Sequence, residues 1–283
     1  MRKSSRLLIV VIFILLLSSS FLTAQEKQPQ RYLAVTTLHW NMDMEDFSMD
    51  EWKAVEKEFT DKVTAKNEYI LATNFGVHFM TADNTELVYV QLFNSWNDID
   101  KSSKRNGELI KAAWADETTR EAFLKKRDSY YDDFHSDEIY ATISGAKPYM
   151  EEEDKEMLFY VRKSHLAFPD DGNGKEFKAL REPFLKEVIH KNQFIKGYYP
   201  YVHAWGADKR DFIEVFVVAT LADLDKALDE SGKLNKARFN DEAKQKVAGK
   251  KMGKYFTGFH ADYVYKSVPG ISKKMPPTPT PSE

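Results

Sequence analysis

A repeat with a period of 125 residues is the feature that most limits how this chain can fold. Residues 51–145 align without a gap with residues 176–270, and 30 of the 95 aligned positions are identical. Self-similarity at a fixed period indicates a repeated structural unit, so the sequence predicts two tandem copies of one module. The clearest matches close each copy: Tyr130, Phe134, His135, Asp137, Tyr140 and Gly145 correspond to Tyr255, Phe259, His260, Asp262, Tyr265 and Gly270.

Each copy is predicted to contain four strands and two helical regions in the order β-α-β-β-α-β. Runs of alternating, β-branched and aromatic residues bounded by turn residues indicate the strands. They are expected at residues 32–40, 70–80, 86–93 and 134–143 of the first copy and at residues 158–168, 195–205, 211–219 and 259–268 of the second. The first strand of one copy aligns with that of the other only across a small gap, so its register stays open.

Capping residues indicate where the helices begin. Ser48 and Asn173 each stand three residues before a glutamate, which is the spacing of a capping box. Pro183 should kink the first helix of the second copy. The second helical region is defined by three matched pairs of residues: it should begin after Ser95 and Thr220, break near Gly107 and Gly232, and resume at Asp116 and Asp241.

This element order is that of the ferredoxin-like module, an α+β fold in which both helices lie on one face of a four-stranded antiparallel sheet. The other face must be covered, so we expect the two modules to pack sheet to sheet as an intrachain pseudo-dimeric barrel. The apolar face of the two third strands is assigned to the helices: Val88, Val90, Leu92, Ile213, Val215 and Val217. The mixed face is assigned to the barrel interior: Tyr89, Gln91, Glu214 and Phe216.

The first 24 residues read as a signal peptide, because a basic start is followed by an apolar run and a small residue before the cleavage point. Cleavage after Ala24 predicts a periplasmic or secreted protein with no membrane association once the signal is removed. The alternative is that the segment stays uncleaved as an N-terminal anchor. Five segments are therefore expected: a signal peptide (1–24), the first module (31–146), an acidic linker (147–156), the second module (157–271) and a disordered Pro-rich tail (272–283).

Composition excludes several classes of function. The chain has no Cys, which removes disulfides, thiolate catalysis and Cys-ligated metal sites. A net charge of −3 with interspersed acids and bases gives no field that attracts phosphate backbones, so nucleic acid is not an expected partner.

The closing strands carry a short motif that resembles a known superfamily. Two modules in one chain, each ending in a strand with the pattern aromatic-His-x-Asp (Phe134 to Asp137 and Phe259 to Asp262), are similar to the dimeric α+β-barrel superfamily in its fused, tandem form. That superfamily includes antibiotic-biosynthesis-type monooxygenases, EthD-like and NIPSNAP-like proteins, and haem-binding chlorite dismutase and Dyp-peroxidase groups. The resemblance implies the fold, whereas an activity taken from it is an analogy, because such folds host many functions.

Histidines are the main candidates for chemistry. Six of the seven fall into pairs related by the repeat: His78 with His203, His135 with His260 and, in one register of the first strand, His39 with His165. Residues two apart on a strand share a face, so each His of the closing motif lies beside its Asp. This arrangement suits a general base oriented by a carboxylate, or equally a structural bridge at a barrel seam. The candidate catalytic residues are His203, His260 and Asp262.

A flat or aromatic ligand would suit the aromatic second strand of the second copy. The candidate ligand-binding residues, drawn from both copies, are His78, Tyr199, Tyr201, Trp205, Glu214, His135 and Asp137. If one half carries the site, the second is favoured. The competing interpretation is an ordinary aromatic-rich barrel core.

No metal ligands are assigned and no cofactor is predicted, but metal or haem stays open as an alternative. His78, His135 and Asp137 could hold a metal ion if their strands met at the barrel seam. In the superfamily that the sequence resembles, haem-ligating histidines lie on or beside a helix, and His190 is the helical candidate here.

These observations predict an exported small-molecule-binding α+β-barrel protein, with the ligand unidentified. It could be a cofactor-independent enzyme that acts on an organic substrate. The alternatives are a non-catalytic interaction scaffold and a His-ligated metal or haem protein. Homo-oligomerisation stays open.

Overall fold

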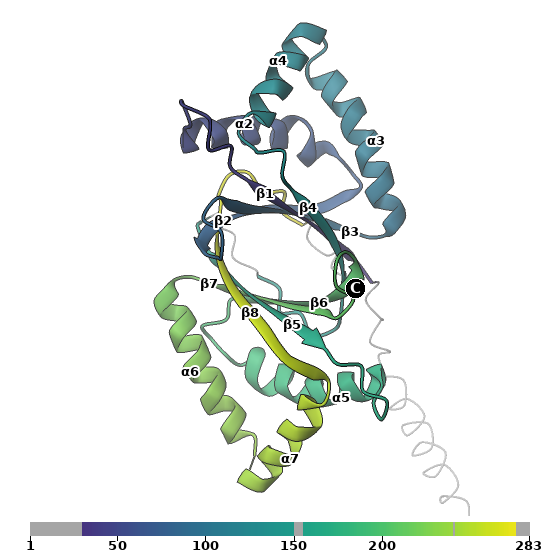
Figure 1. Ribbon diagram of the computed structural model, residues 1–283, viewed down its shortest axis with the longest axis vertical. Coiled ribbons are helices and arrows are strands. Elements are labelled where there is room, and N and C mark those ends of the chain that lie inside the picture. The colour runs from purple at the N-terminus through teal and green to yellow at the C-terminus, as the bar shows by residue number, and fades with distance from the viewer. Residues whose placement is uncertain (1–29, 150–154, 240, 276–283) are drawn as a thin grey trace, which may run out of the picture.

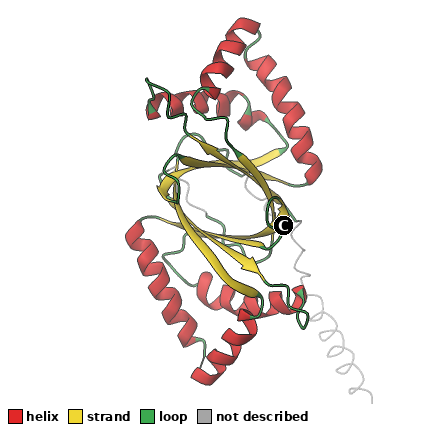
Figure 2. Ribbon diagram, viewed as in Figure 1, coloured by secondary structure: helices red, strands yellow, loops and turns green. Residues whose placement is uncertain are grey.

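The computed structural model describes residues 30–149, 155–239 and 241–275, and in these ranges the strands form one closed barrel with helices outside it (Figures 1 and 2). The expected signal peptide, residues 150–154 of the acidic linker and residues 276–283 of the tail lie outside the described residues. Helices α2, α3 and α4 lie on one side of the barrel, and α5, α6 and α7 lie on the other.

All eight predicted strands form, and their ends differ from the predicted ones by a few residues. Their order around the barrel is β1-β3-β2-β8-β5-β7-β6-β4, and every neighbouring pair is antiparallel. The strands are β1 (Tyr32–His39), β2 (Ile70–Met80), β3 (Glu86–Phe93), β4 (Ser136–Thr142), β5 (Leu158–Leu166), β6 (Gly197–Trp205), β7 (Asp211–Val218) and β8 (Phe256–Ser267).

The barrel closes along two seams between strands that are distant in the sequence. The first half supplies β4-β1-β3-β2 and the second supplies β8-β5-β7-β6, and β2 pairs with β8 while β4 pairs with β6. The halves therefore join by backbone hydrogen bonds at both edges, in addition to facing each other as expected. Closure leaves no sheet edge unpaired among the strands that the structure describes.

The helices begin at the predicted capping residues. Ser48, Ser95, Asn173 and Thr220 each accept a hydrogen bond from the backbone N–H three residues later. The helices are α2 (Met49–Lys62), a 3-10 turn (Thr64–Lys66), α3 (Trp96–Ala113), α4 (Glu117–Asp128), α5 (Gly174–Phe184), a π-helical segment (Leu185–Ile189), α6 (Leu221–Ala237) and α7 (Glu242–Gly253).

The predicted helix breaks at Gly107 and Gly232 are wrong. Both glycines lie within α3 and α6, and the chain leaves the helix later, before it resumes after the N-caps Asp116 and Asp241. A glycine in a helix interior costs only about 1 kcal/mol relative to alanine. Packing of the amphipathic helix against the sheet outweighs a cost of that size.

Pro183 does not end helix α5. Helix α5 continues through Pro183 to Phe184 and then widens into the π-helical segment. Proline has no N–H to donate, and its ring obstructs the carbonyl of residue i−4, here Ala179. A widened turn is one way in which a helix accommodates such a disruption.

The predicted assignment of faces on the third strands is wrong. Cross-strand partners share a face of the sheet. Val88 pairs with Gly76, whereas Tyr89 pairs with Phe75, which packs edge-on against Trp52 of α2. The aromatic face therefore meets the helices, and the valine face lines the barrel interior, which we call the lumen.

The second half is arranged in the same way. Phe216 packs against Tyr198 in the cluster that contains residues of α6 and the π-helical segment. Glu214, predicted to face the interior, accepts a hydrogen bond from the Tyr198 hydroxyl on this same helix-facing side. The residues that face the lumen form a cluster drawn from both halves: Leu33, Val35, Tyr140, Val161, Tyr199, Tyr201, Ile213 and Val215.

Two matched glycines offer a test of packing between barrel and helix. Gly145 and Gly270 both have positive φ, of 106° and 88°, but a Cβ at Gly145 would lie 2.3 Å from Leu185 Cδ1, whereas one at Gly270 meets nothing within 4 Å. Alanine should cost about 1–2 kcal/mol of backbone strain at both sites. Gly145→Ala should cost a further 1–3 kcal/mol or so from overpacking. Urea denaturation of both variants measures the difference, and equal losses would contradict the clash.

Candidate functional site

Four histidines lie at one end of the barrel. Because neighbouring strands are antiparallel, the strand order makes β1, β2, β5 and β6 run in the same direction. His39, His78, His165 and His203 each lie within the last three residues of one of these strands. They therefore gather at the same end, which we call the barrel mouth.

These four side chains share the lumen face with their cross-strand partners on neighbouring strands. The cross-strand pairs are His39 with Glu86, His78 with Tyr265, His165 with Asp211 and His203 with Tyr140.

The strand pairing also settles the register of the first strand of each copy, which the sequence left open. Tyr32 of β1 and Leu158 of β5 occupy equivalent positions, so His39 corresponds to His165.

The second half supplies the denser cluster at the mouth. His165 Nε2 lies 3.6 Å from Asp208 Oδ2 and 3.5 Å from Asp211 Oδ1. Asp211 is 1% exposed, and its Oδ2 lies 2.6 Å from Lys163 Nζ. Asp208 lies in the β6–β7 turn, where its Oδ1 accepts the backbone N–H of Arg210, and hydrogen bonds from Arg210 hold the pKa of Asp208 well below its usual range.

Two tyrosines connect the halves below the mouth. The Tyr140 hydroxyl on β4 lies 2.6 Å from Glu138 Oε2 and 3.3 Å from Asp211 Oδ2 on β7. Tyr265 on β8 donates to Glu86 on β3. Burial, together with these carboxylates, raises the pKa of both Tyr140 and Tyr265 far above the usual range, so both hydroxyls stay protonated as donors.

The first half presents a sparser version of the cluster. His39 Nε2 lies 3.5 Å from Asp83 Oδ2, and Asp83 occupies the β2–β3 turn, where it accepts the backbone N–H of Thr85. The hydrogen bonds from Thr85 lower the pKa of Asp83. His78 Nδ1 lies 2.7 Å from the Thr81 hydroxyl.

The lumen beneath the mouth is apolar and partly accessible. The predicted ligand-binding residues His78, Tyr199 and Tyr201 lie on this face, as does the predicted catalytic residue His203. Trp205 is 57% exposed at the end of β6. Burial raises the pKa of Tyr201. The apolar side chains that line the lumen are only half-buried: Leu33, Val35, Val88, Val90, Val161 and Val215. The mouth therefore combines titratable groups with an apolar floor.

The closing-motif histidines lie on the other face of the sheet. His135 Nε2 is 3.6 Å from Asp137 Oδ2, and His260 Nε2 is 3.5 Å from Asp262 Oδ2, so each predicted pair does form. Asp262 accepts a hydrogen bond from Tyr160, which packs in the helix-facing cluster. Partial burial opposes the shift, but the hydrogen bonds from Tyr160 and Arg162 lower the pKa of Asp262.

This geometry corrects the predicted site. His260 and Asp262 point outward, whereas His203 points into the lumen, so the three candidate catalytic residues do not share a site. Glu214, His135 and Asp137 likewise lie outside the lumen. The aromatic residue of the motif is the one that reaches the mouth: Phe259 stacks on His165 with ring centroids 4.0 Å apart, and Phe134 packs on His39 at 5.0 Å.

Comparison with known proteins identifies the fold. No protein-family model matches the chain, and no curated protein is found to be similar in sequence. Among solved structures, a candidate monooxygenase from Fusobacterium nucleatum has a TM-score of 0.52 at 11% identity over 87% of this chain and 95% of that one. A candidate monooxygenase from Lactobacillus acidophilus has a TM-score of 0.51 at 8% identity over 87% and 96%.

A mutant chlorite dismutase from Candidatus Nitrospira defluvii is similar to the same extent, with a TM-score of 0.50 at 13% identity over 85% of this chain and 92% of that one. These likenesses extend over both halves. The chain has the dimeric α+β-barrel fold. At these identities the likeness concerns the fold alone.

The described residues of this α+β barrel do not fit haem at the predicted place. His190 follows the π-helical segment, is exposed, and its Nε2 lies 3.3 Å from the Gly145 carbonyl oxygen. The predicted metal set does not converge either, because His78 faces the lumen whereas His135 and Asp137 lie on the outer face of the barrel.

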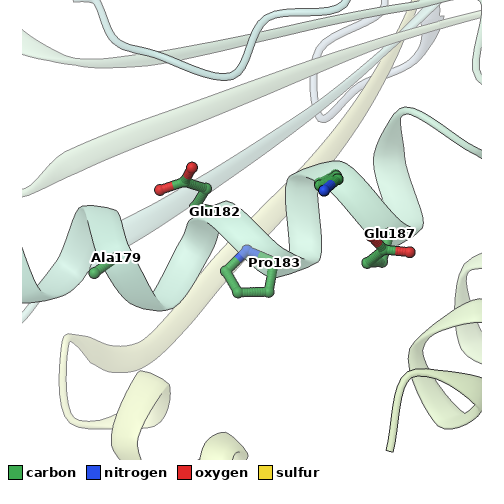
Figure 3. Close-up of a pocket in the computed structure, with 5 residues that line it drawn as sticks. Ala179, Glu182, Pro183 and Glu187 are labelled. Atoms are coloured by element: carbon green, nitrogen blue, oxygen red, sulfur yellow. The ribbon is translucent and has the colours of Figure 1, made fainter. Parts of the chain in front are cut away.

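Two shallow surface depressions lie on the helices outside the α+β barrel. One is lined by Ala179, Glu182, Pro183, Lys186 and Glu187 along α5 and the π-helical segment (Figure 3). The other lies between α5 and α7, around Leu180 and Val247. His78 and His203 line neither. Within residues 30–149, 155–239 and 241–275, no helix is both long enough and apolar enough to cross a membrane.

Sequence reasoning missed the acidic partners of the mouth histidines. Glu86 and Asp211 each open an apolar strand three residues after the turn aspartates Asp83 and Asp208, and they match each other across the 125-residue repeat. An acidic residue at that matched position is the signal that could have revealed them.

Proposed function

We propose that the protein is an exported small-molecule-binding α+β barrel whose ligand occupies the lumen beneath the barrel mouth. The observation that carries this proposal is the convergence of His39, His78, His165 and His203 above half-buried apolar side chains at one end of the barrel. Eight-stranded barrels have interiors just wide enough for packed side chains or one small ligand.

The chemistry of the mouth favours a ligand with an apolar, flat body and a polar end. Tyr199, Tyr201 and the lumen valines would contact the body, and the histidines and Lys163 would meet the polar end. The similarity to candidate monooxygenases supports a small organic ligand by analogy only. If the protein is an enzyme, His203 is the candidate base, because it is the predicted catalytic residue on the lumen face.

We also propose that the halves are tandem copies of a ferredoxin-like module. Both have the element order β-α-β-β-α-β, and their strand orders, β4-β1-β3-β2 and β8-β5-β7-β6, are equivalent. Export follows from the composition of residues 1–24, and N-terminal sequencing of protein secreted by its own host tests the proposed cleavage after Ala24.

Binding of 2-naphthol, a flat neutral aromatic probe, tests the position of the site. His203→Phe narrows the mouth and should weaken binding at least about tenfold, which corresponds to 1.4 kcal/mol. His260→Phe is the matched control, because its side chain is exposed on the outer face, and its dissociation constant should match that of the wild type. Isothermal titration calorimetry measures both.

Two outcomes would contradict the proposal. Equal dissociation constants for the two variants would mean that the probe binds outside the lumen. Absence of binding to the wild type, together with no small molecule in native mass spectra of protein from its own host, would favour the interaction scaffold.

A further inference from the structure

We propose that His165, Asp208 and Asp211 form a binding site for one divalent transition-metal ion at the barrel mouth, with Zn²⁺ as the best-fitting ion. This inference goes beyond the proposed lumen ligand and does not depend on it. The ligand atoms of the three side chains all lie within 4.8 Å of one another. One imidazole and two carboxylates are a donor set that suits such ions.

The distances are close to those of a zinc site. His165 Nε2 lies 3.5 Å from Asp211 Oδ1 and 3.6 Å from Asp208 Oδ2. Ligand atoms bound tetrahedrally at about 2.0–2.2 Å lie roughly 3.3 Å apart. Each of these two distances would therefore shorten by only a few tenths of an ångström on metal binding, and the two carboxylate oxygens lie within 4.8 Å of each other.

Asp211 provides independent support for a bound cation. It is 1% exposed, and its Oδ1 is buried without a hydrogen-bond partner. Its other oxygen is engaged by Lys163 at 2.6 Å and Tyr140 at 3.3 Å. A buried carboxylate oxygen without a partner is costly, and here that oxygen points toward His165 and Asp208.

The surroundings hold the three ligands in place. Phe259 stacks on the His165 ring at 4.0 Å and fixes its plane. Asp208 Oδ1 accepts the backbone N–H of Arg210, and the Arg210 guanidinium pairs with the same carboxylate, with Nη2 2.6 Å from Oδ2. A bound ion would share Oδ2 with that guanidinium. Asp211 is held by Lys163 and Tyr140. Preorganised ligands of this kind raise metal affinity.

The first half provides a matched control. His39, Asp83 and Glu86 are the equivalent residues, and Tyr265 donates to Glu86. Within the described ranges, the three-residue grouping of metal-ligating atoms is found at His165, Asp208 and Asp211 and not at these equivalents. Thr37 stands where the second half has Lys163.

Calorimetric titration of metal-stripped full-length protein with Zn²⁺ tests the site. The wild type should bind one ion per chain. His165→Gln and Asp208→Asn should each weaken binding by more than the 10–100-fold or so that loss of a supporting partner costs, whereas His39→Gln should leave the dissociation constant unchanged. Asp208 and His165 are not core residues, so these variants should fold.

A second variant separates metal ligation from a structural role. Lys163→Met removes a positive charge that lies 2.6 Å from Asp211 Oδ2, so Zn²⁺ should bind more tightly. Loss of a purely structural ion pair would give no such gain in affinity. The proposal is overturned if the wild type does not bind Zn²⁺, or if His165→Gln and His39→Gln have equal effects. Tightened binding in Lys163→Met, lost again in the Lys163→Met/His165→Gln double variant, would support it.

Discussion

Arg127→Met should lower the free energy of unfolding by about 3–5 kcal/mol, because it leaves a buried carboxylate without its counter-ion. Glu56 on α2 is 1% exposed, and Arg127 on α4 reaches it with Nε at 2.9 Å from Oε1 and a hydrogen bond of 3.2 Å from Nη2 to Oε2. The Tyr131 hydroxyl also donates to Glu56, and Trp52 Nε1 donates to that hydroxyl. Urea denaturation at neutral pH measures the loss.

Two controls distinguish this explanation from simple loss of packing. The double variant Glu56→Gln/Arg127→Met removes both charges and should recover most of the stability. Lys104→Met breaks an ion pair with Asp100 whose side chains are 75% and 67% exposed, and exposed pairs contribute only about 0.2–1 kcal/mol. If Arg127→Met cost no more than Lys104→Met, Glu56 would not be a buried charge in solution.

The double variant Tyr140→Phe/Tyr265→Phe should weaken the closure of the barrel by about 2–6 kcal/mol at pH 8. Tyr265 donates to Glu86 on a strand of the other half. The Tyr140 hydroxyl lies 3.3 Å from Asp211 of the other half and 2.6 Å from Glu138 on its own strand. Removing one partner of a buried hydrogen bond costs about 1–3 kcal/mol. Single variants should each show roughly half of the loss.

The wild-type advantage over this double variant should shrink above about pH 10. The folded pKa of both tyrosines is raised, by burial first and then by the carboxylates. A raised pKa contributes stability that is complete below the unfolded pKa of about 10 and is lost as the pH rises, at about 1.4 kcal/mol per pH unit for each group. Denaturation of both proteins at pH 8, 10 and 11 tests the sign. A difference that grows with pH would contradict the assignment.

Local signals made the secondary structure predictable. Ser48, Ser95, Asn173 and Thr220 determine where helices begin through contacts within three residues, and the alternating strands are bounded by turn aspartates. The helix breaks were misplaced because packing of α3 and α6 against the sheet outweighs the small cost of an interior glycine.

The faces of the two third strands, β3 and β7, could not be predicted from hydrophobicity. Both faces of this sheet are covered, so apolar residues such as Val88 satisfy either side. On these two strands the aromatic residues lie on the helix-facing side. That side tolerates Glu214 because Tyr198 and the buried Arg181 complete a hydrogen-bonded chain with it. Such compensation depends on contacts between residues distant in sequence, which a pattern of residues in one strand does not encode.

The repeat identified the important histidines, but their grouping required the topology. His39, His78, His165 and His203 come together because four strands run in the same direction around a closed barrel. Their acidic partners, Glu86 and Asp211, become neighbours only through strand pairing.

Both halves of the barrel lie in one chain, and this has a consequence for how the mouth can change. In an assembly of two identical chains, each substitution appears at both symmetry-related positions. Here Lys163 of the second half occupies the position that Thr37 has in the first half, and Asp211 occupies the position of Glu86. A single mutation can therefore modify one side of the mouth while the other side keeps its stabilising contacts, so the covalent link allows the two sides to specialise separately.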